Sequence, residues 1–387
     1  MKLFRLTTIP SSLNILLRGQ LKFLNQFYEV TVIASDVDKD SWKRVREREK
    51  VKCYPIHIER DIFLWNDIKT LFNLYRLFKK ERPFIVHANT PKASLLGMLA
   101  AKFARIPNRL YTVTGLRFES EGGIKRKVLV KVEKLTCLAA TKVIPEGKGV
   151  KKTLLKYKIT NKPLQIISNG NINGIDIDYF SPSLYSFKQK GKIKNEVRIP
   201  TDSFIFCFIG RLVKDKGINE LVQAFVELNK TYLFTKLLLV GPFERELYPL
   251  FPETERKIQN HPNIISIGEQ ADVRPYLAIS NVFVFPSYRE GFPNVVMEAG
   301  AMDLPCIVTD INGCNEIIED GVNGLIIPPK NKEQLKEKMQ LLLENSDLRN
   351  RLKQKARSMI TSRYEQRMVW EALLKEYWQL ESDNTKK

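Results

Sequence analysis

Two glutamates in the second half of the chain, Glu290 and Glu298, enclose the segment GFPNVVM. They follow the apolar run VFVFPS, which predicts a buried strand, so Glu290 is expected in a loop and Glu298 in the second turn of the next helix. Pro293 suits the first turn of that helix, because its missing N–H costs little there. A carboxylate on a helix that packs against a sheet needs a partner. The hydroxyl groups of a ligand are one such partner for Glu298. The alternative is a surface lysine for Glu298, with Glu290 simply solvated.

A second grouping follows the predicted strand FIFCFIG. It is the loop from Gly210 to Gly217, which carries Arg211 and Lys216. A guanidinium fork, a lysine charge and the free amides at the start of a helix together suit a diphosphate. The alternative is an ordinary strand–loop–helix connection with solvated cations. Gly241 ends the next predicted strand, LLLVG, where the lack of a side chain permits close approach.

Strands and helices must present these loops on one side of a sheet. Short apolar runs alternate with longer amphipathic stretches, which predicts parallel sheets with helices on both faces. Two such series are present, so we expect two doubly wound α/β domains that bind ligands beyond the carboxyl ends of their strands. The predicted helices include 67–80, 91–104, 125–140, 218–229, 332–344 and a final one over 364–380. The polar, weakly periodic stretch from Ser181 to Ser203 is the expected linker.

The net charge of +20 is unevenly distributed. Residues 1–190 contain 36 lysines and arginines against 16 acidic residues, whereas residues 191–387 contain 27 of each. A basic first half predicts an anionic partner such as nucleic acid, an acidic membrane surface or a phosphorylated substrate, although a solubilising surface would have the same composition. The sequence contains no apolar run of membrane-spanning length and no recognisable signal peptide, and its five cysteines form no CxxC pair. We therefore expect a protein of the reducing cytoplasm.

The combination of GR-x(4)-KG with E-GFPNVVM-E resembles the retaining glycosyltransferases of family 4. The resemblance extends over almost the whole chain, through SNGNINGIDIDYFSP from Ser168 and DINGCNEIIEDGVNGLIIPPKN from Asp310. It implies the GT-B fold, in which two Rossmann-like domains face each other across a cleft and a C-terminal helix crosses back to the first. We therefore expect a basic acceptor-side domain at residues 1–185, a nucleotide-sugar donor domain at 186–363 and the returning helix at 364–387.

The resemblance also implies residue roles. The implied catalytic residues are Glu290, which orients the donor sugar, and Arg211 and Lys216, which hold the donor diphosphate and stabilise the leaving group. Glu298 is implied to bind the ribose hydroxyls. The remaining donor-binding positions are Gly210, Gly241, Gly291, Phe292, Asn294 and Val295. Retention is expected to proceed by front-face transfer, in which a donor phosphate oxygen takes the acceptor proton, so no protein base is expected. The resemblance to GT-B enzymes, which generally need no metal for catalysis, implies that no metal cofactor is expected.

The first domain departs from the family pattern at two loops. Relatives carry a Gly-Gly pair after the first strand, where this chain has Pro-Ser-Ser, so Ser11 and Ser12 are the candidates for contacting phosphate there. Relatives also carry a His after the fifth strand, where this chain reads TVTGLR. His87 and Arg117 are the other acceptor-side candidates, with a purely structural role as the alternative for His87.

Two Asp-x-Asp pairs resemble the motifs that hold a metal bound to a nucleotide-sugar. Asp36 and Asp38 follow a predicted strand and are expected to form a turn, and Asp176 and Asp178 lie in the expected inter-domain segment. We assign a metal to neither pair.

The expected function is transfer of a sugar from a nucleotide-sugar, with UDP as the nucleotide that the family implies, to a lipid-linked saccharide in cell-surface polysaccharide synthesis. The basic first half would dock on anionic lipid at the inner face of the plasma membrane. The same chemistry on a soluble acceptor, or a GT-B epimerase, are alternatives. A nucleic-acid-binding protein is disfavoured because no helix–turn–helix or RNA-binding aromatic motif is present. A dinucleotide oxidoreductase is disfavoured because neither domain has GxGxxG after its first strand.

Overall fold

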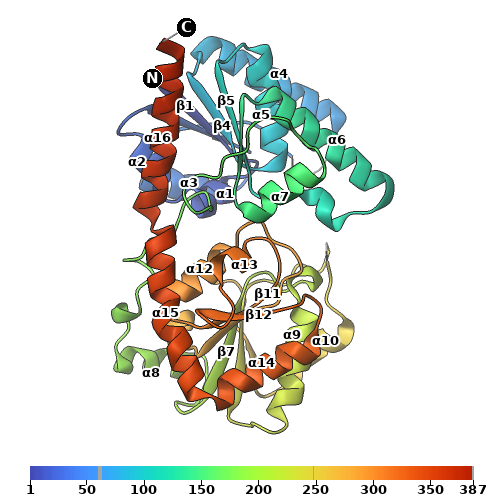
Figure 1. The fold of residues 1–387 in the computed structure, drawn as a ribbon, viewed down its shortest axis with the longest axis vertical. Helices are drawn as coiled ribbons and strands as arrows, with labels where there is room; N and C mark the ends of the chain where they lie inside the picture. Colours follow the sequence, from blue (N-terminus) through green and yellow to red (C-terminus); the bar gives the residue numbers. More distant parts are fainter. Residues whose placement is uncertain (60–62, 247, 386–387) are drawn as a thin grey trace. The chain divides into compact units, whose positions relative to one another are not determined.

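The computed structural model describes residues 1–59, 63–246 and 248–385. The chain divides into two compact units. The N-terminal unit comprises Met1–Gly174 together with Gln366–Lys387, and the C-terminal unit comprises Ile175–Glu365. Each is a parallel sheet covered by helices (Figure 1).

The N-terminal unit contains six parallel strands in the order β3-β2-β1-β4-β5-β6. The strands are β1 (Lys2–Leu6), β2 (Glu29–Ala34), β3 (Lys52–Pro55), β4 (Ile85–Ala88), β5 (Asn108–Val113) and β6 (Lys142–Pro145). The helices are α1 (Pro10–Leu16), α2 (Gln20–Leu24), α3 (Lys39–Glu49), α4 (Leu64–Glu81), α5 (Pro91–Phe103), the short 3-10 helix η1 (Arg117–Ser120), α6 (Gly123–Ala139), α7 (Lys148–Lys156) and α16 (Gln366–Thr385). This strand order is that of a dinucleotide-binding Rossmann fold.

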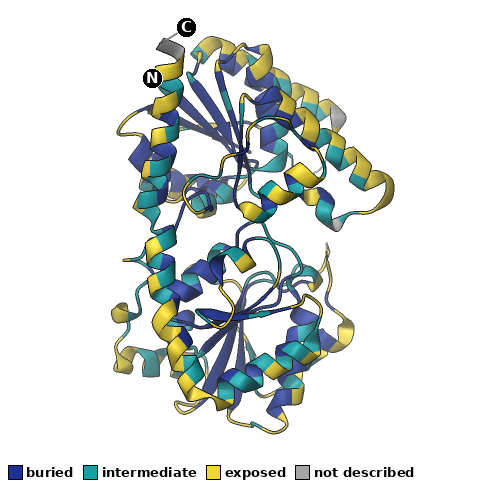
Figure 2. Ribbon diagram, in the orientation of Figure 1, coloured by how far each residue is buried: buried dark blue, intermediate teal, exposed yellow. Residues whose placement is uncertain are grey.

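Two cores lie on opposite faces of this sheet because successive strand residues point to opposite sides. Phe4 and Leu6 of β1 pack with α4, α5 and α6, whereas Leu3 packs with the first three helices and α16. Helix α16 contributes Tyr377, which is fully buried. The central strands β1, β4 and β5 are almost entirely buried (Figure 2). The edge strand β3 is mostly exposed.

The C-terminal unit repeats the same topology with the order β12-β11-β10-β7-β8-β9. Its strands are β7 (Phe204–Ile209), β8 (Thr235–Val240), β9 (Ile264–Ser266), β10 (Val282–Phe285), β11 (Cys306–Thr309) and β12 (Gly324–Ile327). Its helices are η2 (Pro182–Leu184), α8 (Phe187–Glu196), η3 (Lys214–Lys216), α9 (Ile218–Asn229), α10 (Pro252–Asn260), α11 (Arg274–Ile279), α12 (Asn294–Ala301), α13 (Cys314–Ile317), α14 (Lys332–Glu344) and α15 (Ser346–Tyr364). The expectation of two doubly wound domains with a C-terminal helix returning to the first is confirmed.

The predicted linker from Ser181 to Ser203 is wrong, because this stretch contains helix α8. Ser186 and Gln189 form a capping box, in which each side chain bonds the other residue's backbone N–H. Ile193 then packs against the core of the C-terminal unit. The Ser-x-x-Gln spacing is a helix-start signal, which the lysine-rich composition of the stretch obscured.

The N-terminal unit ends at Gly174, whereas the sequence placed the boundary at residue 185. Residues 175–180 belong to the C-terminal unit because they form hydrogen bonds with α15. The backbone N–H of Ile175 donates to the Tyr364 carbonyl over 2.7 Å. Arg357 donates to the carbonyls of Ile177 and Phe180 at 2.8 and 2.6 Å. These contacts join segments far apart in the chain, so composition alone does not reveal them.

Candidate active site

The loop after β7 and the loop after β10 meet at the carboxyl edge of the C-terminal sheet. Gly217 makes this meeting possible: it has φ of +71°, and a Cβ atom there would lie 2.1 Å from the carbonyl oxygen of Pro286. The backbone N–H of Tyr288 also donates to the Asp215 carbonyl at 2.9 Å. These contacts place Lys216 beside the loop that carries Glu290.

Lys216 and Glu290 form an ion pair, and each side chain is only 16% exposed. The hydroxyl of Ser287 donates to the same Glu290 oxygen at 2.8 Å. The ammonium group of Lys216 lies 5.4 Å from the centre of the Phe285 ring. The structure therefore brings together two of the three predicted catalytic residues. Phe285 of β10 and Ser287 of the following loop hold their side chains in place.

Arg211 lies one residue beyond Gly210 and pairs with Glu244 at 2.5 Å. Both side chains are about a third or more exposed, at 42% and 31%. Glu244 lies in the loop after β8 and was not singled out from the sequence. Gly241, at the end of β8, has φ of +144°, and a Cβ atom there would lie 1.9 Å from the Gly210 carbonyl oxygen. This close approach to the Gly210 backbone explains Gly241 and holds the two loops together, whereas Gly210 has φ of +148°, a conformation that favours glycine.

Helix α12 begins at Asn294, with Pro293 as its N-cap residue rather than in its first turn. Asn294 and Val295 are half-buried at the start of this helix, and Glu298 is half-buried one turn further on. The side-chain amide of Asn294 and the carboxylate of Glu298 thus lie one turn apart on one helix, an arrangement suited to a polyhydroxyl ligand.

Phe292 is buried and packs edge-to-face against Tyr364, with ring centres 5.4 Å apart. Only the backbone of Phe292 is thus available to a ligand, as its predicted role through an amide requires. Gly291 precedes it in the turn and is half-buried.

In the N-terminal unit the predicted acceptor-side residues occupy separate places. His87 is 1% exposed, and both its ring nitrogens are occupied: Nδ1 lies 2.6 Å from the Tyr377 hydroxyl and Nε2 lies 2.7 Å from the Thr112 hydroxyl. Burial and the charge of Arg5 hold the pKa of His87 well below its usual value. The imidazole is therefore neutral and makes only internal contacts.

Ser11 and Ser12 lie in the first turn of α1, and Arg117 is exposed on η1. Ser11 lines a depression with a volume of about 460 Å³ beside Asp38 and His57. The structure therefore does not gather the predicted acceptor-side residues into one site.

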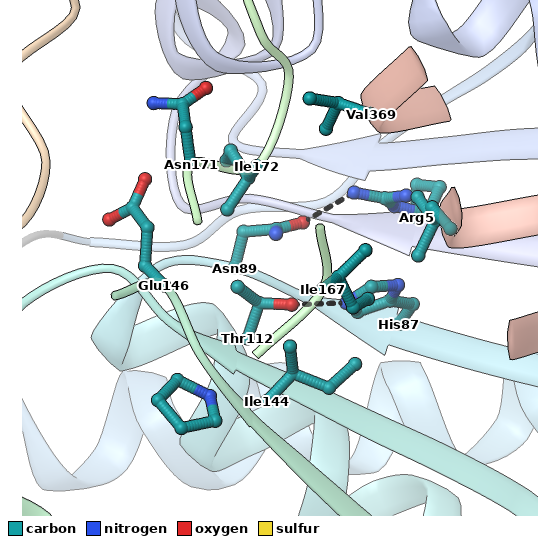
Figure 3. A pocket seen from close by; sticks show the side chains of 12 residues that line it. Arg5, His87, Asn89, Thr112, Ile144, Glu146, Ile167, Asn171, Ile172 and Val369 are labelled. Atoms are coloured by element: carbon teal, nitrogen blue, oxygen red, sulfur yellow. Dashed lines mark hydrogen bonds between the residues drawn. The ribbon is translucent and has the colours of Figure 1, made fainter. Parts of the chain in front are cut away.

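A small cavity at the carboxyl ends of β4, β5 and β6 was not predicted (Figure 3). Its volume is about 20 Å³, and its polar lining includes Arg5, His87, Asn89, Thr112 and Glu146. Arg5 is 1% exposed and donates to three neutral acceptors, on Gln20, Tyr377 and Asn89. The signal in the sequence was an arginine inside the apolar run LFRLTTI, since a charge in a buried strand requires partners.

The Asp-x-Asp pairs make local backbone contacts. Asp38 caps α3 by accepting from the Ser41 N–H at 3.0 Å. Asp176 accepts from the N–H groups of Asp178 and Tyr179 at 3.2 and 2.9 Å. Within residues 1–59, 63–246 and 248–385, no group of three or more His, Cys, Asp or Glu side chains is placed to hold a metal ion.

Comparison of folds defines the class of the protein. The chain superposes on Anabaena Alr3699/HepE, solved in complex with UDP and glucose, with a TM-score of 0.83 over 98% of this chain and 100% of that one, at 18% identity. Two parallel six-stranded Rossmann-like sheets together with this likeness establish the GT-B fold of glycosyltransferases.

Sequence comparison then gives the family. The family model described as Glycosyltransferase Family 4 matches residues 20–171, and the one described as Glycosyl transferases group 1 matches residues 189–359. The capsular polysaccharide biosynthesis glycosyltransferase CapM of Staphylococcus aureus is 32% identical over 96% of this chain and 95% of its own. An Escherichia coli UDP-Gal:alpha-D-GlcNAc-diphosphoundecaprenol alpha-1,3-galactosyltransferase is 31% identical over 69% of this chain and 68% of its own. The chain belongs to glycosyltransferase family 4 and is a glycosyltransferase.

Proposed function

We propose that the protein transfers a sugar from a UDP-sugar, with retention of configuration, to a saccharide carried on a lipid diphosphate in the synthesis of a cell-surface polysaccharide. The observation that carries this proposal is that Lys216 and Glu290 form an ion pair at the carboxyl edge of the C-terminal sheet, with Arg211 in the same loop as Lys216. The cations suit a diphosphate, and the glutamate suits the hydroxyls of the sugar attached to it.

When the donor binds, the two cations exchange their carboxylate partners for the phosphate oxygens of the donor. Lys216 and Arg211 each contact a glutamate, so positive charge is already held where the leaving group would sit. These fixed charges stabilise the negative charge that develops on the departing nucleoside diphosphate. They supply this charge from the protein itself, and we propose that transfer requires no metal ion. Glu298, one turn into α12, binds the ribose hydroxyls.

The acceptor class rests on the relatives. The Escherichia coli relative is named for a diphosphoundecaprenol-linked GlcNAc acceptor, and a Campylobacter jejuni relative, 28% identical over 80% of this chain, is named for a diphospho-undecaprenol-linked one. The similarity to CapM over almost the full length of both chains favours a capsular or related polysaccharide as the product.

A membrane-facing surface of the N-terminal unit fits such an acceptor. None of the described helices is long and apolar enough to span a bilayer. Helix α6 instead exposes Ile124, Val128, Leu135 and Leu138, which recur at helical spacing among four exposed lysines. Helix α4, which packs on the same face of the sheet through α5, exposes Trp65, Ile68 and Phe72 (Figure 1). Exposed apolar side chains among basic ones suit the interface of an anionic bilayer.

The test is a transfer assay with a panel of UDP-, GDP- and ADP-sugars and short-chain prenyl-diphosphate saccharides as acceptors. We expect a glycosylated lipid product with one UDP-sugar. UDP should also raise the melting temperature of the wild type but not of Glu298→Ala. Preference for another nucleotide would overturn the UDP assignment, and transfer only to soluble sugars would overturn the lipid-linked acceptor.

A further inference from the structure

The small cavity of the N-terminal unit is lined by hydrogen-bond donors whose directions follow from Arg5. A guanidinium can only donate. Its Nη2 donates to Asn89 Oδ1 at 2.9 Å, which fixes the orientation of that amide and turns Nδ2 away from the arginine. Asn89 is 1% exposed, and among the described residues its Nδ2 has no hydrogen-bond partner.

The second donor follows from a chain of three hydrogen bonds. Arg5 Nη1 donates to the Tyr377 hydroxyl at 3.0 Å, so this hydroxyl gives its own proton to His87 Nδ1, 2.6 Å away. Neutral His87 therefore carries its proton on Nε2 and donates to the Thr112 hydroxyl at 2.7 Å. The Thr112 hydroxyl accepts this bond, and its own proton remains to be donated into the cavity that it lines.

An acceptor group lies on the other side. Figure 3 shows Glu146 across the cavity from Arg5 and His87, with Asn89 and Thr112 between them. Glu146 is 4% exposed, at the end of β6. A carboxylate has about four lone-pair positions, so it accepts a ligand proton in addition to its other contacts. Two donors and a carboxyl group that line one small cavity match a hydroxyl group, which both accepts and donates hydrogen bonds.

The size of the cavity limits what enters it. A volume of about 20 Å³ admits one water-sized group and not a sugar ring. The cavity lies at the carboxyl ends of the strands, where ligands of open α/β sheets bind.

We propose that this cavity is a subsite for one hydroxyl group of the acceptor saccharide, which accepts hydrogen bonds from Asn89 and Thr112 and donates one to Glu146. This inference rests on the proposed transfer to a saccharide acceptor. It assigns the acceptor contact to residues other than Ser11, Ser12 and Arg117.

The experiment compares Thr112→Val, Thr112→Ser and Asn89→Asp in the transfer assay, with the prenyl-diphosphate saccharide that the wild type uses and its monodeoxy analogues. Thr112→Val removes the hydroxyl at nearly constant shape, and Thr112→Ser restores it. We expect Thr112→Val to raise the acceptor KM about three- to tenfold, with the donor KM unchanged. Thr112→Ser should be near the wild type, and Asn89→Asp, which replaces the donor by a carboxylate, should exceed tenfold. With the wild type, the acceptor KM of one monodeoxy analogue should be raised by the same factor as Thr112→Val raises that of the full acceptor. With Thr112→Val, removal of that hydroxyl should raise the acceptor KM no further.

Thr136→Val is the matched control, because Thr136 is buried to a similar degree and its hydroxyl bonds the Val132 carbonyl within α6 at 2.9 Å. Acceptor KM values within twofold of the wild type in both Thr112→Val and Asn89→Asp, with only lower melting temperatures, would mean that the cavity holds a structural water and would overturn the subsite. Absence of transfer by the wild type to every acceptor would overturn the proposed function, and the subsite with it. UDP stabilisation of each variant verifies that it is folded.

Discussion

Replacing Lys216 by Met tests the donor site most sharply. The substitution keeps the length of the side chain and removes one positive charge from the loop after β7. The side chain is 16% exposed, so its charge acts in a partly desolvated environment. A unit charge about 4 Å from the developing charge contributes roughly 4 kcal/mol at an effective dielectric constant of about 20. Each 1.36 kcal/mol corresponds to a tenfold change in rate, so the upper limit is about a thousandfold. Loss of single donors to developing oxyanions reduces kcat by about 100- to 1,000-fold in other enzymes.

We therefore expect Lys216→Met to lower kcat about 100- to 1,000-fold, with a smaller rise in the donor KM, measured by release of nucleoside diphosphate in the presence of acceptor. Lys214→Met is the matched control, because Lys214 lies in the same loop, carries the same charge and is exposed. Its kcat should stay within threefold of the wild type.

The ion pair between Lys216 and Glu290 provides a second test, a double variant. If Lys216 served only to neutralise Glu290, then Lys216→Met combined with Glu290→Gln would restore both stability and activity, since no buried charge would be left without a partner. If both residues contact the donor, the double variant regains thermal stability but stays at least a hundredfold less active. Glu290→Gln alone should reduce transfer more than tenfold. A kcat within threefold of the wild type in Lys216→Met would refute the reasoning.

Three further predictions concern the membrane, metal ions and pH. Changing Lys125, Arg126 and Lys127 to Gln should weaken binding to phosphatidylglycerol vesicles at least tenfold, at about 1 kcal/mol per basic residue, and leave donor hydrolysis unchanged. Changing the three exposed basic residues in 351–355 to Gln is the control and should not affect sedimentation with the vesicles. An equal loss of binding in both variants would contradict the proposed docking surface. Millimolar EDTA should leave the transfer rate within twofold, whereas loss that Mg²⁺ or Mn²⁺ restores would contradict metal-free transfer. Burial raises the pKa of Glu133 from 4.5 to about 7, so the unfolded chain releases this proton at a lower pH than the folded chain does. The free energy of unfolding should therefore fall by roughly 3 kcal/mol as the pH rises from 4.5 to about 7. Urea unfolding of Glu133→Gln should lack this slope, and an identical slope in both proteins would exclude Glu133 as its source.

The sequence determines the relative placement of the proposed donor-site residues better than that of the acceptor-side candidates, for a physical reason. Arg211 and Lys216 share one loop, and Glu290 and Glu298 share one loop–helix segment, so their spacing determines their placement. The structure adds Glu244 as the partner of Arg211. This pair depends on the close approach of the loops after β7 and β8 at Gly210 and Gly241, which the sequence does not reveal.

The small cavity of the N-terminal unit joins residues that no local pattern connects. Arg5 meets Asn89 because β1 pairs with β4, and it meets Tyr377 because α16 returns to this unit. Strand order and the position of the last helix set these contacts, whereas sequence reasoning treated His87 as an isolated candidate. The same limit applied to α8, whose capping box was obscured by a composition typical of linkers.

The most direct test of the central claim is the anomeric configuration of the product. The wild type is incubated with the UDP-α-sugar that it uses and a prenyl-diphosphate saccharide, and the new linkage is examined by proton NMR. The account predicts an α-linkage formed without added metal and at least tenfold less product with Glu290→Gln. A β-linkage, or undiminished product from Glu290→Gln, would contradict it.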